Sequence, residues 1–237
     1  PDIAEYEVDP LPSLTNASDD RAPVYFDGCH QGLTESELVM CDYGVAESDV
    51  TLMLVGGSHS AHWLPALELI AQTNDWRLIS ATKSACLFSS DPPGSGQERS
   101  SCVDWNEALL DAVIEESPEL VIMTATRGQG AEEHVPAGYL DMWRALEEHD
   151  IQVAALRDTP RFESNRVDCL AQHGLSSTSC DDPRGKHLAQ EDPTKMVADD
   201  LTNVSFIDMT PYFCDEETCY SVIGNVVVYY DAHHITA

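Results

Sequence analysis

The feature that most constrains this chain is an apolar run that glycine ends and a helical pattern follows. Residues 50–55 read Val-Thr-Leu-Met-Leu-Val, which is typical of a buried strand, and Gly56 and Gly57 end the run. Ser58 comes next, and apolar residues then recur with helical spacing at Trp63, Leu64, Leu67 and Ile70. Ser58 is therefore predicted to lie where a strand turns into a helix, which is where open α/β sheets bind ligands.

The rest of the chain repeats this alternation of strands and helices. Further strands are predicted at 76–81, 120–123, 151–156, 204–207 and 225–230. Helices are predicted at 105–114 with Ser101 as N-cap, at 139–146 and at 193–201, whereas residues 157–191 are predicted to be irregular. Short apolar strands suit a parallel sheet covered on both faces, so the expected fold class is α/β, a three-layer doubly wound parallel sheet.

The first part of the chain has a different character. Residues 1–49 are rich in Pro, Asp and Ser and show little apolar periodicity, so we expect a linker and an N-terminal extension packed on the domain. The domain itself is expected to span residues 50–237, which is enough chain for one sizeable core.

The two ends of the α/β pattern offer a nucleophile and a base. A serine needs a base, and the base needs a group that orients it. The predicted strand 225–230 runs into Asp231-Ala232-His233-His234, where Asp231 and His234 can face the same way. We therefore predict Ser58, His234 and Asp231 as a catalytic triad, with His233 as the competing base. A serine that only caps a helix and a solvated terminal turn are the alternative interpretations.

At this point the chain resembles a known family. Gly56-Gly57-Ser58-His59 and Asp231-x-x-His234 are similar to the first and last blocks of SGNH (GDSL-like) hydrolases. More closely, the chain resembles the extracytoplasmic SGNH domain fused to membrane-bound acyltransferase family 3 proteins. Further matching stretches are 25–29 (YFDGC), 41–44 (CDYG), 82–86 (TKSAC), 157–161 (RDTPR) and 213–214 (FC). The resemblance covers nearly the whole chain.

Two blocks depart from that family pattern. Gly57 stands where the family usually has an Asp that supports the nucleophile loop, and no Gly-x-Asn block supplies the usual oxyanion Asn. The resemblance places Thr126 or Arg127 at the position of that Asn. It also implies a second oxyanion donor near Ser84 and a pocket-lining role for His59.

The resemblance also implies a reaction. The domain would pass an acyl group, usually acetyl, through Ser58 to a hydroxyl of a cell-envelope glycan or glycolipid. No cofactor is expected in this domain, because the acyl donor would derive from acetyl-CoA through a membrane acyltransferase domain of the same polypeptide. That upstream segment would tether the domain outside the cytoplasm, in the periplasm or at the cell surface.

Three other functions stay open at this stage. The first is a secreted carbohydrate O-acetyl esterase with the same triad. The second is a metal-dependent hydrolase, whose candidate ligands are His59, His62, Asp231, His233 and His234. The third is a non-catalytic glycan-binding domain, which Gly57 suggests. We expect no metal, because nothing else in the chain has a metal-site signature.

Charge and cysteine content narrow the setting. The formal net charge of −30 argues against nucleic acid and anionic lipid as direct partners. The chain has eight cysteines, and an even number in an oxidising compartment favours disulfides. On the order of a hundred pairings are possible, and proximity along the chain favours Cys29–Cys41, Cys86–Cys102, Cys169–Cys180 and Cys214–Cys219.

Overall fold

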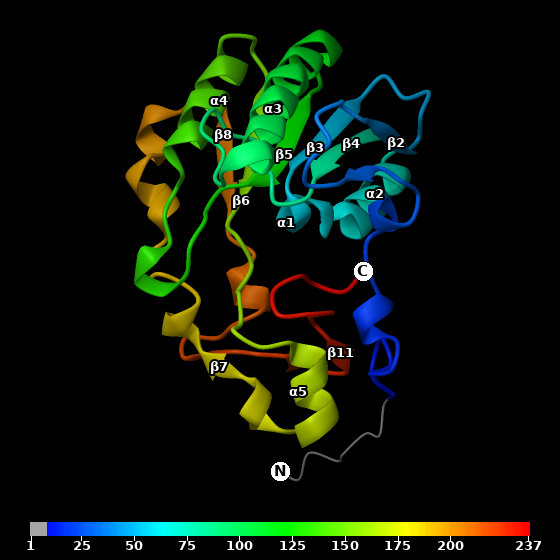
Figure 1. Cartoon of the computed structure of the whole chain (residues 1–237), viewed down its shortest axis with the longest axis vertical. Helices are drawn as coiled ribbons and strands as arrows, with labels where there is room; N and C mark the ends of the chain where they lie inside the picture. Colours follow the sequence, from blue (N-terminus) through cyan, green and yellow to red (C-terminus); the bar gives the residue numbers. More distant parts are fainter. Residues whose placement is uncertain (1–8) are drawn as a thin grey trace.

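A mostly parallel sheet forms the centre of the computed structural model, which describes residues 9–237 (Figure 1). Its strands are β1 (His30–Gln31), β2 (Cys41–Gly44), β3 (Thr51–Gly56), β4 (Arg77–Lys83), β5 (Leu120–Thr124), β6 (Gln152–Leu156) and β8 (Val204–Ile207). The order is β1-β4-β3-β5-β6-β8, and β2 also pairs with β4, antiparallel to it. The edge strands β1 and β2 come from the part of the chain assigned to the N-terminal extension, whose boundary at residue 49 stays a prediction.

Side chains of each strand alternate between two covered faces, as the pleat requires. In β3, Met53 and Val55 pack with helices α3 (Gly96–Glu116) and α4 (Ala137–Glu147). Leu52 and Leu54 pack on the other face with α1 (Ser58–Ala61) and α2 (Leu64–Thr73). Helices therefore cover both faces of the sheet, and the prediction of a three-layer α/β fold is confirmed.

The chain reverses its direction of winding at β3. From β3 it passes to β4 on one side, and from there to β5, β6 and β8 on the other side. The carboxyl ends of β3 and β5 thus form a topological switch point, where α/β sheets hold their ligands. Ser58 follows β3 and Thr126 follows β5 closely, so both lie at this edge.

The helix that begins at Ser58 is shorter than its apolar pattern suggested. α1 stops at Ala61, and α2 starts at Leu64. Pro65 lies in the first turn of α2 and has no N–H to donate to the carbonyl of Ala61, so a continuous helix would lose that bond.

Helix α3 corrects another expectation. It begins at Gly96 with Ser95 as N-cap, so the prediction that Ser101 caps it is wrong. Ser101 lies one turn further, and its hydroxyl donates to the carbonyls of Glu98 and Leu33 at 3.0 and 2.9 Å. Such bonding within a helix is available to serine as readily as capping.

A loop-rich part lies below the sheet in Figure 1, on the side where α1 follows β3. It contains α5 (Arg166–His173) within the stretch predicted to be irregular. Its short strands are β7 (Asp182–Pro183), β9 (Thr218–Cys219), β10 (Val222–Ile223) and β11 (Val226–Val227). The 3₁₀ turns of the part of the chain that the structure describes are η1 (Ala17–Asp19), η2 (Pro23–Tyr25), η3 (Gly130–Glu132), η4 (Thr178–Cys180), η5 (Arg184–Lys186), η6 (Pro193–Met196), η7 (Ala198–Asp200) and η8 (Thr210–Tyr212). The helix predicted at 193–201 therefore consists of two such turns.

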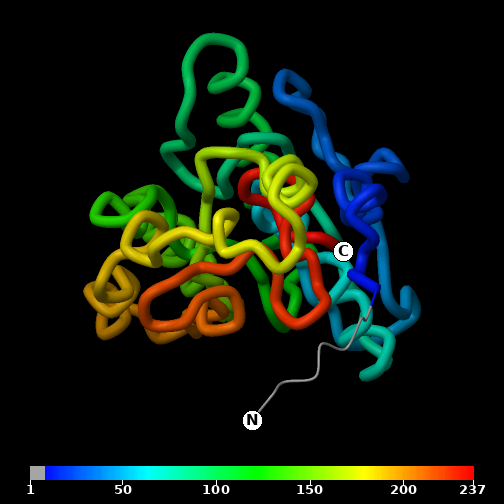
Figure 2. The backbone as a smooth tube through the Cα atoms, turned by 90° about the horizontal axis from the view of Figure 1, so that it is seen from below, coloured from blue at the N-terminus to red at the C-terminus, as the bar shows by residue number. Residues whose placement is uncertain are grey.

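The predicted strand at 225–230 does not join the central sheet. Only Val226 and Val227 are strand, and they pair with β10 across the two-residue turn Gly224-Asn225. Gly224 has φ of +62°, which a tight hairpin turn of this kind requires. Seen from below in Figure 2, this red segment runs beside α5, whose Val167 and Leu170 pack against Val227.

Disulfides join the four sequential cysteine pairs that were expected: Cys29–Cys41, Cys86–Cys102, Cys169–Cys180 and Cys214–Cys219. The bond from Cys86 to Cys102 ties the turn after β4 to α3 and so holds one wall of the site described next. Among the helices of residues 9–237, none is both long and apolar enough to cross a membrane.

Candidate active site

The loop after β3 presents Ser58 at the switch point. Ser58 is half-buried and is the first residue of α1, so its N–H has no partner within the helix. Gly56 makes the turn possible, because its φ is +118° and a Cβ there would lie 2.8 Å from the Ser60 hydroxyl. A hydroxyl and a free N–H therefore lie together at a helix start, where the helix dipole favours negative charge.

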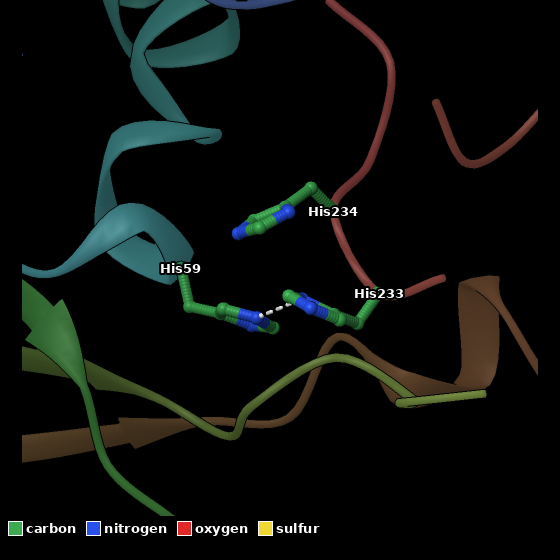
Figure 3. Close-up of side chains that lie close together, drawn as sticks. All are labelled: His59, His233 and His234. Carbon is green, nitrogen blue, oxygen red and sulfur yellow. Dashed lines mark hydrogen bonds between the residues drawn. The ribbon is translucent and has the colours of Figure 1, made fainter. Parts of the chain in front are cut away.

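The last turn of the chain is held by Asp231. Its Oδ1 accepts the N–H groups of His233 and His234, each at 2.8 Å, and the Tyr230 N–H donates to the His234 carbonyl at 3.0 Å. This Asx-type turn fixes the backbone from which both histidines project. The rings of His233 and His234 point from this segment toward α1 (Figure 3).

Ser58, His234 and Asp231 form one hydrogen-bonded relay. The Ser58 Oγ lies 2.8 Å from His234 Nε2, and His234 Nδ1 lies 2.7 Å from Asp231 Oδ2. Burial opposes ionisation of Asp231, but hydrogen bonds from His234 and the His233 backbone outweigh it and hold the pKa of that carboxyl well below its usual range. An ionised Asp231 accepts the proton on Nδ1, which leaves Nε2 free to accept the Ser58 hydroxyl proton.

A second relay runs beside the first. His59 Nδ1 lies 2.6 Å from Asp158 Oδ1, and His59 Nε2 lies 2.8 Å from His233 Nδ1. The other oxygen of Asp158 accepts two hydrogen bonds from Arg161, at 2.8 and 3.0 Å. Burial would raise the pKa of the Asp158 carboxyl, but His59 and Arg161 outweigh it and lower that pKa well below its usual range.

The histidines around His234 are neutral near pH 7. Burial lowers the pKa of His59 to about 3, although Asp158 opposes the shift. Burial and the neighbouring His234 lower the pKa of His233 to about 4. Burial also holds the pKa of His62 far below its usual range, and neither of its ring nitrogens has a hydrogen-bond partner within residues 9–237.

Three of the five residues considered as metal ligands come together. Nitrogens of His59, His233 and His234 all lie within 4.8 Å of one another. Asp231 instead orients His234, through the opposite ring nitrogen from the one that faces Ser58. His62 lies next to the group, with its ring 5.1 Å from that of His59.

A small cavity of about 20 Å³ lies beside Ser58. Its walls include three of the residues predicted to bind substrate, namely His59, Thr126 and Arg127. Ser84 lines a neighbouring pocket of about 220 Å³ that shares Ala85 and Arg127 with the first. A larger hollow of about 850 Å³, between Arg184, Leu188 and Glu216, contains none of the relay residues.

Thr126 and Arg127 differ in what they can offer a ligand. The Thr126 hydroxyl donates to Glu133 and accepts from the Asp158 N–H, both at 3.0 Å, so its proton is already engaged. The Arg127 side chain makes no ion pair or hydrogen bond within the described residues. Arg127 lines both of these pockets.

Two residues of the site escaped the sequence analysis. Ala85 has φ of +52°, and its N–H makes no hydrogen bond within residues 9–237, so it is a second free donor on the cavity wall. No sequence signal marks an alanine for the left-handed region. Arg161 was noted only as part of a motif, and its bond to Asp158 depends on the path of the loop after β6.

Comparisons with known proteins bear on the family and the fold of the chain. No curated protein matches the chain. The fold is similar to that of the periplasmic domain of a lipopolysaccharide acetyltransferase from Salmonella ser. Paratyphi A, with a TM-score of 0.61, 16% identity, and coverage of 94% of this chain and 90% of that one. Residues 28–237 match the model of the SGNH domain fused to AT3 domains. By that match over most of its length, the chain belongs to the family of SGNH domains that are fused to AT3 acyltransferase domains.

Proposed function

We propose that this extracytoplasmic domain transfers an acyl group through Ser58 to a hydroxyl of a cell-envelope glycan or glycolipid. The observation that carries the proposal is the relay, because residues 58 and 234 meet at 2.8 Å with Asp231 behind them. The family of the chain supports acyl transfer as the reaction. The four disulfides support a location outside the cytoplasm.

In the first half-reaction, the Ser58 Oγ attacks the acyl carbonyl carbon while His234 Nε2 takes the hydroxyl proton. The imidazolium is stabilised by the ionised Asp231. The tetrahedral intermediate collapses, the bond to the donor's leaving group breaks, and His234 returns its proton to that group. The acyl group then remains on Ser58 as an ester.

In the second half-reaction, an acceptor hydroxyl takes the place of the leaving group. His234 removes the hydroxyl proton as the acceptor oxygen attacks the ester carbon. The bond to Ser58 breaks, and His234 returns the proton to the Ser58 oxygen. One base therefore serves both steps, and no external reductant, oxidant or metal is consumed.

The cavity walls supply the groups that an oxyanion needs. Ser58, Ala85 and Arg127 line one small space, and their candidate donors are two backbone N–H groups and a guanidinium. A cavity of about 20 Å³ has room for little more than one water-sized group, so it favours a short acyl chain such as acetyl. The neighbouring pocket at Ser84 is the natural place for part of the donor or acceptor.

The partner that loads Ser58 is proposed to be an AT3 membrane domain of the same polypeptide. The family match is to SGNH domains that are fused to such domains. The acyl group would derive from acetyl-CoA through that membrane domain, so this domain itself would need no cofactor. The link to the membrane domain would tether it outside the cytoplasm.

Covalent trapping tests the proposal. The purified chain is incubated with p-nitrophenyl acetate and quenched in acid, and peptides are analysed by mass spectrometry. We expect one acetyl group on Ser58, and none there in Ser58→Ala or His234→Ala. Ser60→Ala is the matched control, because Ser60 lies in the same helix and its hydroxyl has no hydrogen-bond partner within the described residues. Acetylation of Ser58 that is equally fast in His234→Ala would contradict the relay.

A carbohydrate O-acetyl esterase would use the same relay with water as acceptor. The two functions separate when an alcohol or oligosaccharide acceptor is added to the acetylated protein. Transfer of the acetyl group to the acceptor in preference to hydrolysis supports the transferase. If the domain only binds a glycan, the Ser58→Ala variant would bind it as tightly as the wild type does, and Ser58 would never be acetylated.

A further inference from the structure

Three imidazoles converge at the site, and the proposed acyl transfer uses only one of them. His59 projects from α1, and His233 and His234 project from the C-terminal turn toward it (Figure 3). Within residues 9–237, the group formed by His59, His233 and His234 is the one set of potential ligands that converges in this way. Each contributes one nitrogen, and the three nitrogens lie within 4.8 Å of one another.

The hydrogen bonds around the cluster leave the right nitrogens available. His59 donates its Nδ1 proton to Asp158, so Nε2 carries a lone pair toward His233. His234 donates its Nδ1 proton to Asp231, so Nε2 carries a lone pair toward Ser58. His233 has to place its proton on Nε2, instead of Nδ1, to offer a third lone pair, and this exchange between tautomers leaves the ring neutral.

His59 and His234 each have a carboxylate behind the ring, as metal-binding histidines generally do. Such histidines generally donate the second ring N–H to a carboxylate, which fixes the tautomer and makes the ligand more basic. Asp158 does this for His59 at 2.6 Å, and Asp231 does it for His234 at 2.7 Å. His62 lies beside the cluster, 2% exposed, and neither of its ring nitrogens has a partner within the described chain.

The distances suit a tetrahedral ion after small side-chain rotations. Zinc binds imidazole nitrogen at about 2.0–2.1 Å, so two ligands of a tetrahedral site lie roughly 3.4 Å apart. The nitrogens of His59 and His233 are 2.8 Å apart and need to open slightly. The nitrogen of His234 lies within 4.8 Å of both. The net charge of −30 also favours a cation over an anion.

We propose that His59, His233 and His234 form a binding site for a divalent transition-metal ion such as Zn²⁺, with water or the Ser58 hydroxyl as fourth ligand. The ion takes the Nε2 lone pair of His234 that otherwise accepts the Ser58 proton. Metal binding and activation of Ser58 by His234 therefore exclude each other. This consequence, reversible inhibition by the metal, rests on the proposed function, whereas the binding itself does not.

Calorimetric titration of the chain with Zn²⁺ tests the site directly. We expect one ion per chain, and binding at least tenfold weaker in His233→Gln and in His59→Gln. Asp158→Asn, which removes the carboxylate behind His59, is expected to weaken binding about 10–100-fold. His149→Gln is the matched control, because His149 is exposed beyond the end of α4. Equal binding by the wild type and by both cluster variants, or no binding at millimolar Zn²⁺, would overturn the proposal.

Three further measurements keep the test independent of folding and of the proposed function. Co²⁺ bound to the wild-type chain is expected to give the intense visible absorption of a tetrahedral site, whatever the stability of the variants. Ser58→Ala is expected to retain the ion, because three of the four ligands remain. Zn²⁺ is expected to slow acetylation of Ser58 in the wild type, and EDTA to restore it. Binding without acetylation under any condition would refute the proposed function and leave the metal site standing. Acetylation of Ser58 without any metal binding would refute the metal site and leave the proposed function standing.

Discussion

Gly57, which stands where the family usually has Asp, allows a sharp test of the nucleophile loop. Its backbone, with φ of −89° and ψ of −168°, is extended and open to any residue. The constraint is space, because a Cβ at Gly57 would lie 3.1 Å from the Cys86 carbonyl oxygen and 3.8 Å from that of Lys83. Cys86 is fully buried and tied by its disulfide to Cys102, so this wall cannot easily yield.

The magnitude for Gly57→Ala follows from two opposing effects. Overpacking of a tight site costs about 1–3 kcal/mol, and the smaller entropy of the unfolded alanine chain returns about 0.4–1 kcal/mol. We expect a net loss of about 1–2 kcal/mol in the free energy of unfolding. Displacement of Ser58 relative to Ala85 is expected to slow acetylation of Ser58 up to about 100-fold. Gly57→Asp is expected to lose more stability and more activity than Gly57→Ala, because it places a carboxylate-bearing side chain beside two carbonyl oxygens.

The assays are urea unfolding and the rate of acetylation by p-nitrophenyl acetate. Gly185→Ala is the matched control, because a Cβ at Gly185 would meet no atom within 4 Å. That variant is expected to be unchanged or stabilised by about 0.4–1 kcal/mol. If Gly57→Asp were as stable as the wild type and acetylated faster, the reasoning from the Cys86 wall would be refuted.

Four other outcomes are expected. Asp231→Asn should slow acetylation of Ser58 by about 10⁴-fold, because the relay loses the group that sets the His tautomer, whereas Asp199→Asn, at an exposed position, should leave the rate unchanged. Arg127→Gln should slow the same step about 10²–10³-fold, with Arg127→Lys in between, and a rate equal to wild type would remove Arg127 from the oxyanion site. Because burial lowers the pKa of His59 to about 3, the unfolded chain binds a proton that the native state excludes. The contribution of neutral His59 to the free energy of unfolding is fully present above its ordinary pKa of about 6.5, and it falls by up to about 1.4 kcal/mol per pH unit below that pH. The free energy of unfolding of His59→Gln, measured with urea, should therefore change less between pH 6.5 and 5 than that of the wild type. Raising KCl from 0.1 to 1 M should increase Tm by at least about 2–4 °C, because salt screens the repulsion of a chain with net charge −30, and a Tm that falls would show that other ion effects dominate.

Local signals in the chain were sufficient for much of the fold. The β3 run, Gly56 and the following apolar spacing placed Ser58 at a strand–helix junction, where the structure has it. Such signals work because buried strands and helices have different periods. The break between α1 and α2 was not predicted, although Pro65 explains it because proline cannot donate a helical hydrogen bond.

Other local signals were ambiguous, and packing decided between the alternatives. Residues 225–230 have the composition of a central strand, yet Gly224-Asn225 makes a hairpin with the preceding segment. The edge of the central sheet next to β6, where a further strand could pair, is instead occupied by β8. Short-range hairpin closure is entropically easier than pairing with a distant strand, and sequence composition alone does not weigh the two.

The amino-acid sequence by itself determined the α/β class and favoured the four cysteine pairs, because both depend on residue type and local spacing. It also named Ser58, Asp231 and His234, but left His233 as the competing base until the structure placed His234 next to Ser58. Only the tertiary structure decided that His59, His233 and His234 converge and that, among residues 9–237, the Ala85 N–H and the Arg127 side chain have no partner. These are properties of where separate loops end in space. The path of a loop depends on packing against the rest of the molecule, which no local pattern encodes.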